Sequence, residues 1–486
     1  MGLLLALDLG TTSTRALVID DEVVCGRSAS PLEVHFPEPG RVEQDPEQWV
    51  EASVGAIRAA LAQAGRAASD VAALGIASQR STTLAWDAST GRALGPAIGW
   101  QDQRTRERVA ELNARDIPIT TLPSATKFEW WLRHDATIAD AARRGTLRLG
   151  TPDAWLTFRL SGGAAHVTEP GQASCTALYD YTHGDWSDPA LALFGIDERW
   201  LPEIVATDAV VAQTSRSLLG AAIPLAARAG DQQAATFAQG VHSAGQAKLT
   251  LGTAAMLDLH TGAAPAAPPR GAYPLALWRL EGSKDEFCLE GSVLSAGAAV
   301  EWLVDLGLLP DAASLDASAA SVASAEGVAF VPALQGLGTP YLDDGARGLI
   351  GGLTRGSTAA HVAAALIDGL AHRCVDLCDA FQLDPRPLRV DGGLSRSDLL
   401  LQRLADHAGR SIVRGFETEA TAVGVARLAG RAVGGAGDVQ TSRAQPEAST
   451  RFEPRSSQAE RDGARERWRA ILVRVSDAPG HEPAGP

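Results

Sequence analysis

The chain has few sulfur-containing and few aromatic residues. Its 486 residues include five cysteines, two methionines and 5% Phe, Trp and Tyr. No two cysteines form a Cys-x-x-Cys pair, and an odd number fits no closed set of disulfides. Cys374 and Cys378 lie four residues apart on an expected helix, which allows a metal or redox pair, although two small core residues are the simpler interpretation. The cysteines therefore predict no disulfide framework.

Acidic residues outnumber basic residues by 58 to 43, which gives a net charge of −15. This balance argues against a nucleic-acid or an anionic-membrane partner, because both require a basic surface. A phosphate ligand remains open, since a few backbone N–H groups and one arginine hold it. No apolar run approaches the length of a membrane-spanning helix, and Asp8 interrupts the first apolar run too early for a secretory signal. We expect a cytoplasmic protein.

Several common catalytic motifs are missing. The sequence has no G-x-G-x-x-G after a strand, no G-x-x-x-x-G-K-[ST], no H-E-x-x-H and no G-x-S-x-G. The ten histidines are scattered; His361 and His372 share an expected helix without the spacing of metal ligands. Dinucleotide, P-loop, zinc-protease and serine-hydrolase chemistry are thereby disfavoured.

Length and apolar content suit two α/β domains. Apolar runs and helical periodicity in the first half predict strands at 3–9, 15–20, 22–26, 71–78 and 84–87, and a helix at 46–64 with Asp45 as its N-cap. The second half predicts a hairpin of 248–251 and 255–259, strands at 328–334 and 388–391, and helices at 295–306, 357–381, 397–407, 420–429 and 459–475. Strands that alternate with helices indicate an α/β fold.

Both halves begin with a hairpin about a Gly-Thr turn, which we interpret as a distant internal duplication with a nucleotide in the cleft. The predicted domains are 1–240 and 241–475, with the change near Gly240 to Gly245. Residues 433–447 are expected to form a loop and 476–486 a disordered tail.

The two turns are candidate phosphate sites. Gly10-Thr11-Thr12-Ser13 follows an apolar run, and Gly252-Thr253 is a shorter copy. Such a turn directs backbone N–H groups and hydroxyls at one point, although an ordinary hairpin turn has the same pattern. Asp8 favours the phosphate interpretation, because a carboxylate at the end of a buried strand is costly unless it is paired or near a cation. A Mg²⁺ ion that carries a nucleotide is a natural partner.

A lone carboxylate lies between the two turns, in Gly230-Asp231-Gln232. Phosphoryl transfer to an alcohol requires positioning, charge neutralisation and a carboxylate that takes the hydroxyl proton. Asp231 is the candidate base. Its alternative role is the N-cap of a helix, and the two roles are compatible because a helix begins with its positive end.

Three further segments are candidate ligand contacts. Asp391-Gly392-Gly393 follows a predicted strand and leaves a bare surface for an adenine or a ribose, or simply a tight turn. Gln79-Arg80 and the run Trp100 to Arg104 follow strands of the first half, where an arginine and a tryptophan near a carboxylate suit a polyhydroxylated ligand. A surface salt bridge is the alternative for Arg80 or Asp102 taken singly.

Together these motifs resemble the FGGY family of carbohydrate kinases, and within it the glycerol kinase branch, over residues 3–475. The resemblance is carried by 76–80, 151–156, 166–168, 230–233, 289–292 and 347–348. The second family signature fits from Gly348 to Asp368, with Leu366 as a mild departure.

The resemblance implies two actin-like (ribonuclease H-like) domains with ATP·Mg²⁺ in the interdomain cleft, and Asp231 as the catalytic base. It places Asp8 at the metal and Arg80, Trp100, Asp231 and Gln232 at the acceptor, which is a small polyol or sugar. The residues it places around the nucleotide are Thr11, Thr12, Ser13, Arg15, Gly252, Thr253, Gly297, Glu301, Gly393 and Ser397. Homo-oligomers are usual in such families, so we expect one here by analogy.

The departures from the branch lie in the acceptor pocket. Ser81 stands where glycerol kinases have Glu after Gln-Arg, and Leu122 stands where they have a Tyr. Trp131 breaks the first family signature, and Trp100-x-Asp102-x-Arg104 resembles the xylulose kinase pattern. Our hypothesis is an intact kinase with a changed acceptor, a larger polyol or a ketose. The alternatives are a ketose kinase of xylulokinase type and a non-catalytic nucleotide-binding switch, which has no need of Asp231.

Overall fold

The computed structural model describes residues 2–415, 419–434 and 449–475. The chain forms two compact units: unit 1 comprises Met1–Gly240, Leu275–Phe287 and Glu419–Arg443, and unit 2 comprises Val241–Pro274, Cys288–Thr418 and Ala444–Pro486. The first segment of unit 1 ends at Gly240. Neither unit is a single stretch, however, because the chain passes between the units within β18 (Tyr273–Arg279) and β19 (Asp285–Val293). Two contiguous halves do not describe this exchange. The predicted loop lies largely outside the described residues, and the predicted tail lies entirely outside them.

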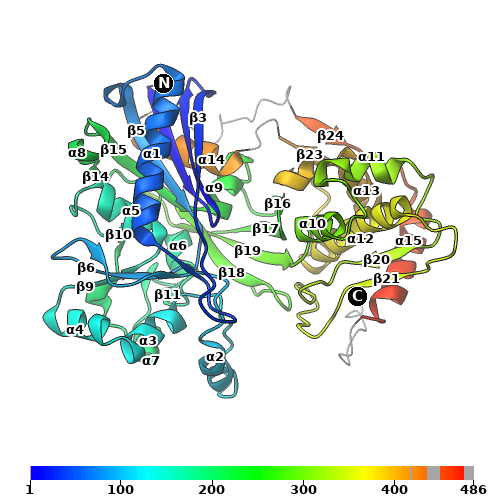
Figure 1. Cartoon of the computed structure of the whole chain (residues 1–486), viewed down its shortest axis with the longest axis horizontal. Helices are drawn as coiled ribbons and strands as arrows, with labels where there is room; N and C mark the ends of the chain where they lie inside the picture. The colour runs from blue at the N-terminus through cyan, green and yellow to red at the C-terminus, as the bar shows by residue number, and fades with distance from the viewer. Residues whose placement is uncertain (1, 416–418, 435–448, 476–486) are drawn as a thin grey trace. The chain divides into compact units, whose positions relative to one another are not determined.

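Unit 1 is built on a six-stranded sheet of mixed direction (Figure 1). The strand order is β14 (Ala212–Gln213), β15 (Pro224–Gly230), β5 (Val71–Ser78), β1 (Leu3–Leu9), β2 (Ser13–Asp20) and β3 (Val23–Pro31). The first three strands of the chain form the expected antiparallel meander. β5 lies parallel to β1, and β15 lies parallel to β5.

Two helices cover opposite faces of this sheet. Leu5 and Leu7 of β1 belong to the same core cluster as Trp49 of α1 (Pro46–Ala64). Leu4, whose side chain must point the other way, lies against Gly430 of α14 (Ala420–Ala432). α1 begins as expected, because the Asp45 side chain accepts a hydrogen bond from the Glu47 N–H. The continuous apolar run of β1 is therefore the signature of a strand covered on both faces.

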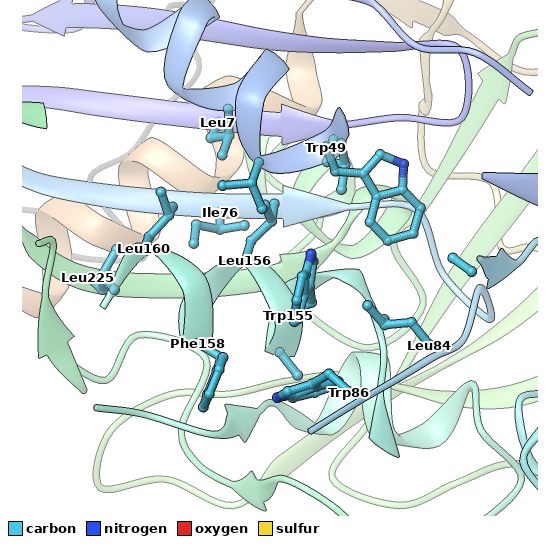
Figure 2. Close-up of a cluster of buried hydrophobic side chains, with 14 of the residues drawn as sticks. Leu7, Trp49, Ile76, Leu84, Trp86, Trp155, Leu156, Phe158, Leu160 and Leu225 are labelled. Atoms are coloured by element: carbon cyan, nitrogen blue, oxygen red, sulfur yellow. The ribbon is translucent and has the colours of Figure 1, made fainter. Parts of the chain in front are cut away.

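A group of tryptophans fills the core beneath α1 (Figure 2). Trp86 of β6 (Leu84–Asp87) and Trp155 of α5 (Pro152–Leu160) meet edge to face with ring centroids 5.4 Å apart. The Trp155 indole N–H donates to the carbonyl of Pro46 at 3.0 Å. This bond satisfies a buried donor and ties the first turn of α1 to α5, so the helix has a fixed position on the sheet.

Unit 2 contains a second sheet of seven strands. The strand order is β18, β19, β17 (Ala255–Gly262), β16 (Ala247–Leu251), β22 (Leu388–Asp391), β23 (Ile412–Arg414) and β24 (Thr450–Phe452). The long helices are α10 (Gly297–Asp305), α12 (Ala359–Ala380), α13 (Asp398–Ala408) and α15 (Gln458–Leu472), all at positions that periodicity predicted. β18, β19, β23 and β24 were not predicted.

The two sheets repeat one topology. The order β3-β2-β1-β5-β15 in unit 1 corresponds to β19-β17-β16-β22-β23 in unit 2. In each, an antiparallel hairpin is followed by two parallel strands. This correspondence supports the internal duplication inferred from the two Gly-Thr turns.

The remaining elements decorate the two units. Those of unit 1 are β4 (Glu43–Gln44), β7 (Arg92–Ala93), β8 (Ala97–Ile98), α2 (Arg106–Asn113), α3 (Ala125–His134), α4 (Ala136–Arg144), β9 (Leu147–Gly150), β10 (Val167–Thr168), α6 (Pro170–Ser174), β11 (Tyr179–Asp180), β12 (Asp185–Trp186), α7 (Asp188–Phe194), β13 (Glu203–Ile204), α8 (Arg216–Leu219) and α9 (Asp231–Ala238). Those of unit 2 are α11 (Leu315–Ala320), β20 (Ala329–Val331) and β21 (Leu349–Gly351). Among the described residues, every helix is too short or too polar to cross a bilayer.

Cys374 and Cys378 lie in the core of unit 2. Both side chains are buried within α12, and burial raises the pKa of both thiols, that of Cys378 to about 12. Thiols of such high pKa are poor nucleophiles and poor metal ligands. The structure thus agrees with two core residues rather than a redox pair.

We predict that Gly424→Ala strongly destabilises unit 1. A Cβ at position 424 of α14 would overlap with the backbone carbonyl of Ala234 in α9. Because backbone cannot yield like a side chain, the loss should reach at least about 1–3 kcal/mol, measured as the free energy of unfolding. Gly55, in the middle of α1, has no atom within 4 Å of its would-be Cβ. Gly55→Ala is the matched control and should add about 0.5–1 kcal/mol, since it only reduces chain entropy. Equal effects of the two changes would contradict this packing.

Candidate active site

The candidate site of unit 1 lies at the carboxyl ends of three neighbouring strands. Leu9 of β1 pairs with Ser78 of β5, and Ser78 pairs with Gly230 of β15. Because β1, β5 and β15 run parallel, the residues that follow them leave the sheet at one edge. The Gln79 N–H donates to the Leu9 carbonyl at 2.8 Å, which holds two of these segments together. Ligands of open α/β sheets bind at this edge.

Asp231 is the first residue of α9, and Gly230 is the N-cap. Asp231 is therefore not the N-cap that we considered as its alternative role. Its Oδ1 accepts from the Gln232 N–H at 2.8 Å and from the Arg80 Nε at 3.1 Å. The side chain is 32% exposed. A carboxylate that is oriented by an arginine, open to solvent and placed at a helix start has the geometry of a general base for a bound hydroxyl.

Asp8 lies on the same edge and is almost fully buried. Burial raises the pKa of its carboxyl to about 7, nearby Arg15 opposes this rise, and the charges of Asp231 and Glu419 add to it. Arg15 lies 3.7 Å from Asp8 and 3.7 Å from Glu419, so one exposed arginine serves two carboxylates. Thr12, also exposed, and Ser13 complete the turn between the two strands.

A cation is chemically compatible with this arrangement. Among the described residues, no three His, Cys, Asp or Glu side chains converge closely enough to hold a metal by themselves. Mg²⁺ is usually held by one or two carboxylates together with substrate phosphates and water. Asp8 offers one carboxylate whose charge is poorly compensated by the protein, which fits that mode of binding.

Ser81 is held in an unusual backbone conformation. Its φ of 61° lies in the left-handed region, and its hydroxyl donates to the Cys175 carbonyl at 3.3 Å. The Lys127 ammonium, fully buried on α3, donates to the carbonyls of Ser81 and Leu122, both at 2.9 Å. Burial lowers the pKa of Lys127 to about 7. Lys127 thus joins Ser81 and Leu122, the two positions at which we expect the acceptor pocket to depart from glycerol kinases.

Both carboxylate oxygens of Asp102 accept hydrogen bonds from groups of the protein itself. Its Oδ2 accepts from the Val42 N–H at 2.7 Å and from Arg104 Nη2 at 2.8 Å. Its Oδ1 accepts from Arg104 N and Nε, both at 2.9 Å. As placed, the side chain orders the segment after Trp100 and presents no free oxygen to an acceptor. Trp100, in contrast, is 37% exposed.

Unit 2 gathers its own set of candidate residues around the β16–β17 turn. The Gly297 N–H donates to the Gly252 carbonyl at 2.9 Å, and the Ala296 and Ala298 N–H groups donate to the Thr253 carbonyl at 2.9 and 3.1 Å. A Cβ on Gly297 would lie 2.8 Å from the Gly252 oxygen, so this close contact requires glycine. Glu301 follows one turn later on α10 and is exposed. The turn and the start of α10 form one backbone-built surface.

The turn after β22 lies beside it. Gly392 has a φ of 86° and packs against the backbone of Leu251, while a Cβ on Gly393 would meet nothing within 4 Å. Gly393 therefore presents the bare surface that the sequence suggested. Ser397 caps α13, since its hydroxyl accepts from the Leu400 N–H at 3.0 Å, and it donates to Asp316.

The structure adds residues that sequence reasoning did not place in the site. Lys127 lies on an amphipathic helix, where a lysine is usually a surface residue. Gln44 and Thr82 lie in no sequence motif that would have marked them as site residues, although Gln44 falls just before the expected helix cap. Glu419 follows residues outside the described part of the chain.

Comparison with known proteins identifies a family for both units. The N-terminal domain of the FGGY family of carbohydrate kinases matches residues 3–238, and the C-terminal domain of that family matches residues 247–433. The glycerol kinase of Aromatoleum aromaticum is 44% identical to this chain, with 98% of this chain and 99% of the relative aligned. The matches thus span both units.

Solved structures give the same result. The glycerol kinase of Plasmodium falciparum with ADP superposes with a TM-score of 0.91 at 27% identity and covers 99% of both chains. A xyloylose kinase from Brucella ovis has a TM-score of 0.85 at 28% identity and covers 97% of this chain and 99% of its own. The family matches and the full-length similarity together cover almost the whole chain, and the chain belongs to the FGGY family of carbohydrate kinases.

Proposed function

We propose that this protein transfers the terminal phosphoryl group of ATP to a hydroxyl of a small polyol or sugar, with Asp231 as the general base. The observation that carries the proposal is the position of Asp231, oriented by Arg80 at the edge where β1, β5 and β15 end. Full-length similarity to glycerol kinases supports it. Thr11, Thr12, Ser13 and Arg15 of unit 1 are the proposed phosphate contacts, and Gly252, Thr253, Gly297, Glu301, Gly393 and Ser397 of unit 2 are the proposed remaining nucleotide contacts.

In this mechanism the acceptor hydroxyl gives its proton to Asp231 as its oxygen forms a bond to the terminal phosphorus. The bond between that phosphorus and the oxygen of ADP breaks, and the electron pair leaves with ADP. Arg80 holds the carboxylate toward the acceptor, and Trp100 and Gln232 bind the acceptor beside it. Asp8 is the proposed metal residue; bound Mg²⁺ would supply charge neutralisation for the phosphates.

The acceptor is proposed to differ from glycerol. Replacing a carboxylate by Ser81 removes a charged hydrogen-bond acceptor, worth about 1.5–3 kcal/mol per bond. The Ser81 hydroxyl is also directed to the Cys175 carbonyl rather than held free. With the tyrosine replaced by Leu122 as well, glycerol should bind several hundred-fold more weakly, at about 1.4 kcal/mol per tenfold. A larger polyol or a ketose is the expected acceptor.

The deciding experiment is an ADP-release assay with Mg·ATP and a panel of glycerol, erythritol, longer alditols, D- and L-xylulose and ribulose. One acceptor that stands well above the others would establish both the reaction and its substrate, and a ketose would establish the xylulokinase alternative. Glycerol as the best acceptor would contradict the specificity argument while leaving the kinase intact. No turnover with any acceptor, together with intact ATP binding, would favour the non-catalytic switch. Light scattering on the same sample tests the homo-oligomer proposed by analogy.

The double change Ser81→Glu and Leu122→Tyr is expected to raise kcat/KM for glycerol by at least about tenfold, the equivalent of one restored hydrogen bond. The backbone accommodates the change, because serine already carries a Cβ in the left-handed conformation, and the Lys127 ammonium, which donates to the Ser81 carbonyl, lies near the new side chain. Ser217→Glu, at an exposed site on α8, adds the same charge elsewhere and should leave kcat/KM unchanged. An unaltered kcat/KM in the double variant would refute this account of specificity.

A further inference from the structure

Four residues beside Asp231 close a ring of hydrogen bonds. The Gln79 side-chain oxygen accepts from the hydroxyls of Thr11 at 3.2 Å and Thr82 at 3.1 Å. The Thr82 hydroxyl accepts from the Trp100 backbone N–H at 3.1 Å. The Trp100 indole N–H donates to the Thr11 hydroxyl at 3.1 Å and completes the ring.

A second amide locks the ring from behind. Gln79 Nε2 donates to Gln44 Oε1 at 2.9 Å, and Gln44 Nε2 donates to the Thr11 carbonyl at 2.8 Å. Gln44, Gln79 and Thr82 are buried. A buried amide must have its hydrogen bonds satisfied, so these partners fix which end of each amide is oxygen and which is nitrogen. The ring therefore has one defined direction of donors and acceptors.

The ring joins two functions that the proposed mechanism keeps apart. Thr11 belongs to the proposed phosphate turn, and Trp100 forms the proposed wall of the acceptor site. Gln79 bonds to the first of these directly and to the second through Thr82. The exposed indole of Trp100 is tied to the protein by its bond to Thr11.

The Thr11 hydroxyl has a single proton, and in this structure it is given to Gln79. A phosphoryl oxygen is a stronger acceptor, because hydrogen bonds to charged groups are about twice as strong as neutral ones. The phosphoryl nearest to Asp231 must be the transferred one, since it has to meet the hydroxyl that Asp231 deprotonates. When it arrives, Thr11 turns its proton from Gln79 to the phosphate, and its oxygen becomes a better acceptor for the Trp100 N–H. Gln79 then holds Thr11 through Gln44, which donates to the Thr11 carbonyl.

We propose that Gln79 is a positioning residue that couples the phosphate turn to the acceptor wall. It holds Trp100 through Thr82 and Thr11 through Gln44, so that the terminal phosphate of ATP, once it takes the Thr11 proton, tightens the wall against which the acceptor packs. Linkage requires the reciprocal effect, in which a bound acceptor raises the affinity for ATP by the same factor. The inference rests on the proposed function and adds to it a pathway of substrate synergy within unit 1.

The first test follows the indole N–H of Trp100 by two-dimensional ¹H–¹⁵N NMR, with Trp100→Phe to identify its signal among the eleven tryptophans. Mg·AMPPNP should move the Trp100 signal to lower field, as expected for a stronger hydrogen bond, whereas Mg·ADP should not. In Gln79→Met the nucleotide-induced movement should fall to less than half. A wild-type signal that ignores AMPPNP, or an equal movement in Gln79→Met, overturns the proposal.

The second test measures linkage by calorimetry, as the ratio of AMPPNP dissociation constants without and with a saturating concentration of the best acceptor from the ADP-release panel. The ratio should be at least about 5 in the wild type, the lower end of usual coupling, and should fall to within twofold of 1 in Gln79→Met and in Trp100→Phe. Gln101→Met, at an exposed neighbour of Trp100, is the control and should keep the wild-type ratio. An unchanged ratio in Trp100→Phe refutes the coupling, and this surface variant decides the matter even where Gln79→Met does not fold.

These outcomes separate the inference from the proposed function. If the kinase is active but the variants change neither the linkage ratio nor the NMR signals, the coupling through the ring is refuted, while the proposed reaction is unaffected. Absence of turnover on the whole acceptor panel, with an AMPPNP-dependent Trp100 signal, refutes the reaction and leaves the ring standing.

Discussion

Asp231→Asn is expected to lower kcat by about 100-fold to 10,000-fold, the usual contribution of a positioned base. The asparagine side chain keeps the size of the carboxylate but cannot take the hydroxyl proton, and it loses the charge that Arg80 pairs with at 3.1 Å. The dissociation constant of Mg·AMPPNP should change by less than about threefold, because Asp231 acts on the acceptor. Steady-state turnover and equilibrium binding on the same preparation measure both effects.

A matched control is Asp188→Asn. Asp188 is also an aspartate at the first position of a helix, α7, and is exposed. It should leave kcat unchanged, since it shares the helix position of Asp231 but not its place at the end of β15. Retention of more than about a hundredth of the wild-type kcat in Asp231→Asn would remove the base assignment.

Lys127→Met is expected to change how the stability of the protein depends on pH. Burial lowers the pKa of Lys127 to about 7 in the folded chain, with Asp102 raising it and Arg104 lowering it further, while an unfolded lysine titrates near its model value of 10.5. Between these two values the unfolded state binds the extra proton, so stability rises with pH. A full pKa unit corresponds to about 1.4 kcal/mol, so the wild type should gain about 2 kcal/mol between pH 7 and pH 9 from this one group.

The variant lacks this gain. The difference in unfolding free energy between wild type and Lys127→Met should therefore grow in favour of the wild type by about 2 kcal/mol over the same pH range. Near pH 7 the difference should be smaller, because methionine also avoids the cost of burying a charge. Lys284→Met changes an exposed lysine, and its free energy of unfolding should stay parallel to that of the wild type at every pH. Parallel curves for Lys127→Met would mean that Lys127 titrates as an ordinary surface lysine.

Much of the fold follows from apolar runs and helix caps. The run Leu3 to Leu9 predicts a strand covered on both faces, and α1 and α14 cover them. The two Gly-Thr turns predict the duplication that the strand orders display. The return of residues 275–287 and 419–443 to unit 1 could not be predicted, because it depends on contacts between distant segments that leave no local pattern.

The candidate site was predicted in part. Asp8 lies at the end of the predicted strand 3–9 and Arg80 follows the predicted strand 71–78, and polar residues in such places signal function. Asp231 was singled out by its position between the two Gly-Thr turns, since the strand before it was not predicted. Asp102 illustrates the limit, since its spacing to Trp100 and Arg104 suggested a ligand contact while its oxygens are taken by backbone and arginine donors. The same limit hid Lys127, whose partners are backbone carbonyls that no residue type reveals.

The position of α14 has a consequence for how the protein folds while it is being synthesised on the ribosome. This helix packs onto β1, β5 and β15, yet it is synthesised after nearly the whole chain. Until Ala432 has emerged, the part of the first sheet that α14 covers, including Leu4, lacks this cover. Nascent chains generally fold from the N-terminus, but here the first unit cannot be completed until α14 has been made. The apolar surface that α14 covers is therefore exposed to misassociation for most of translation.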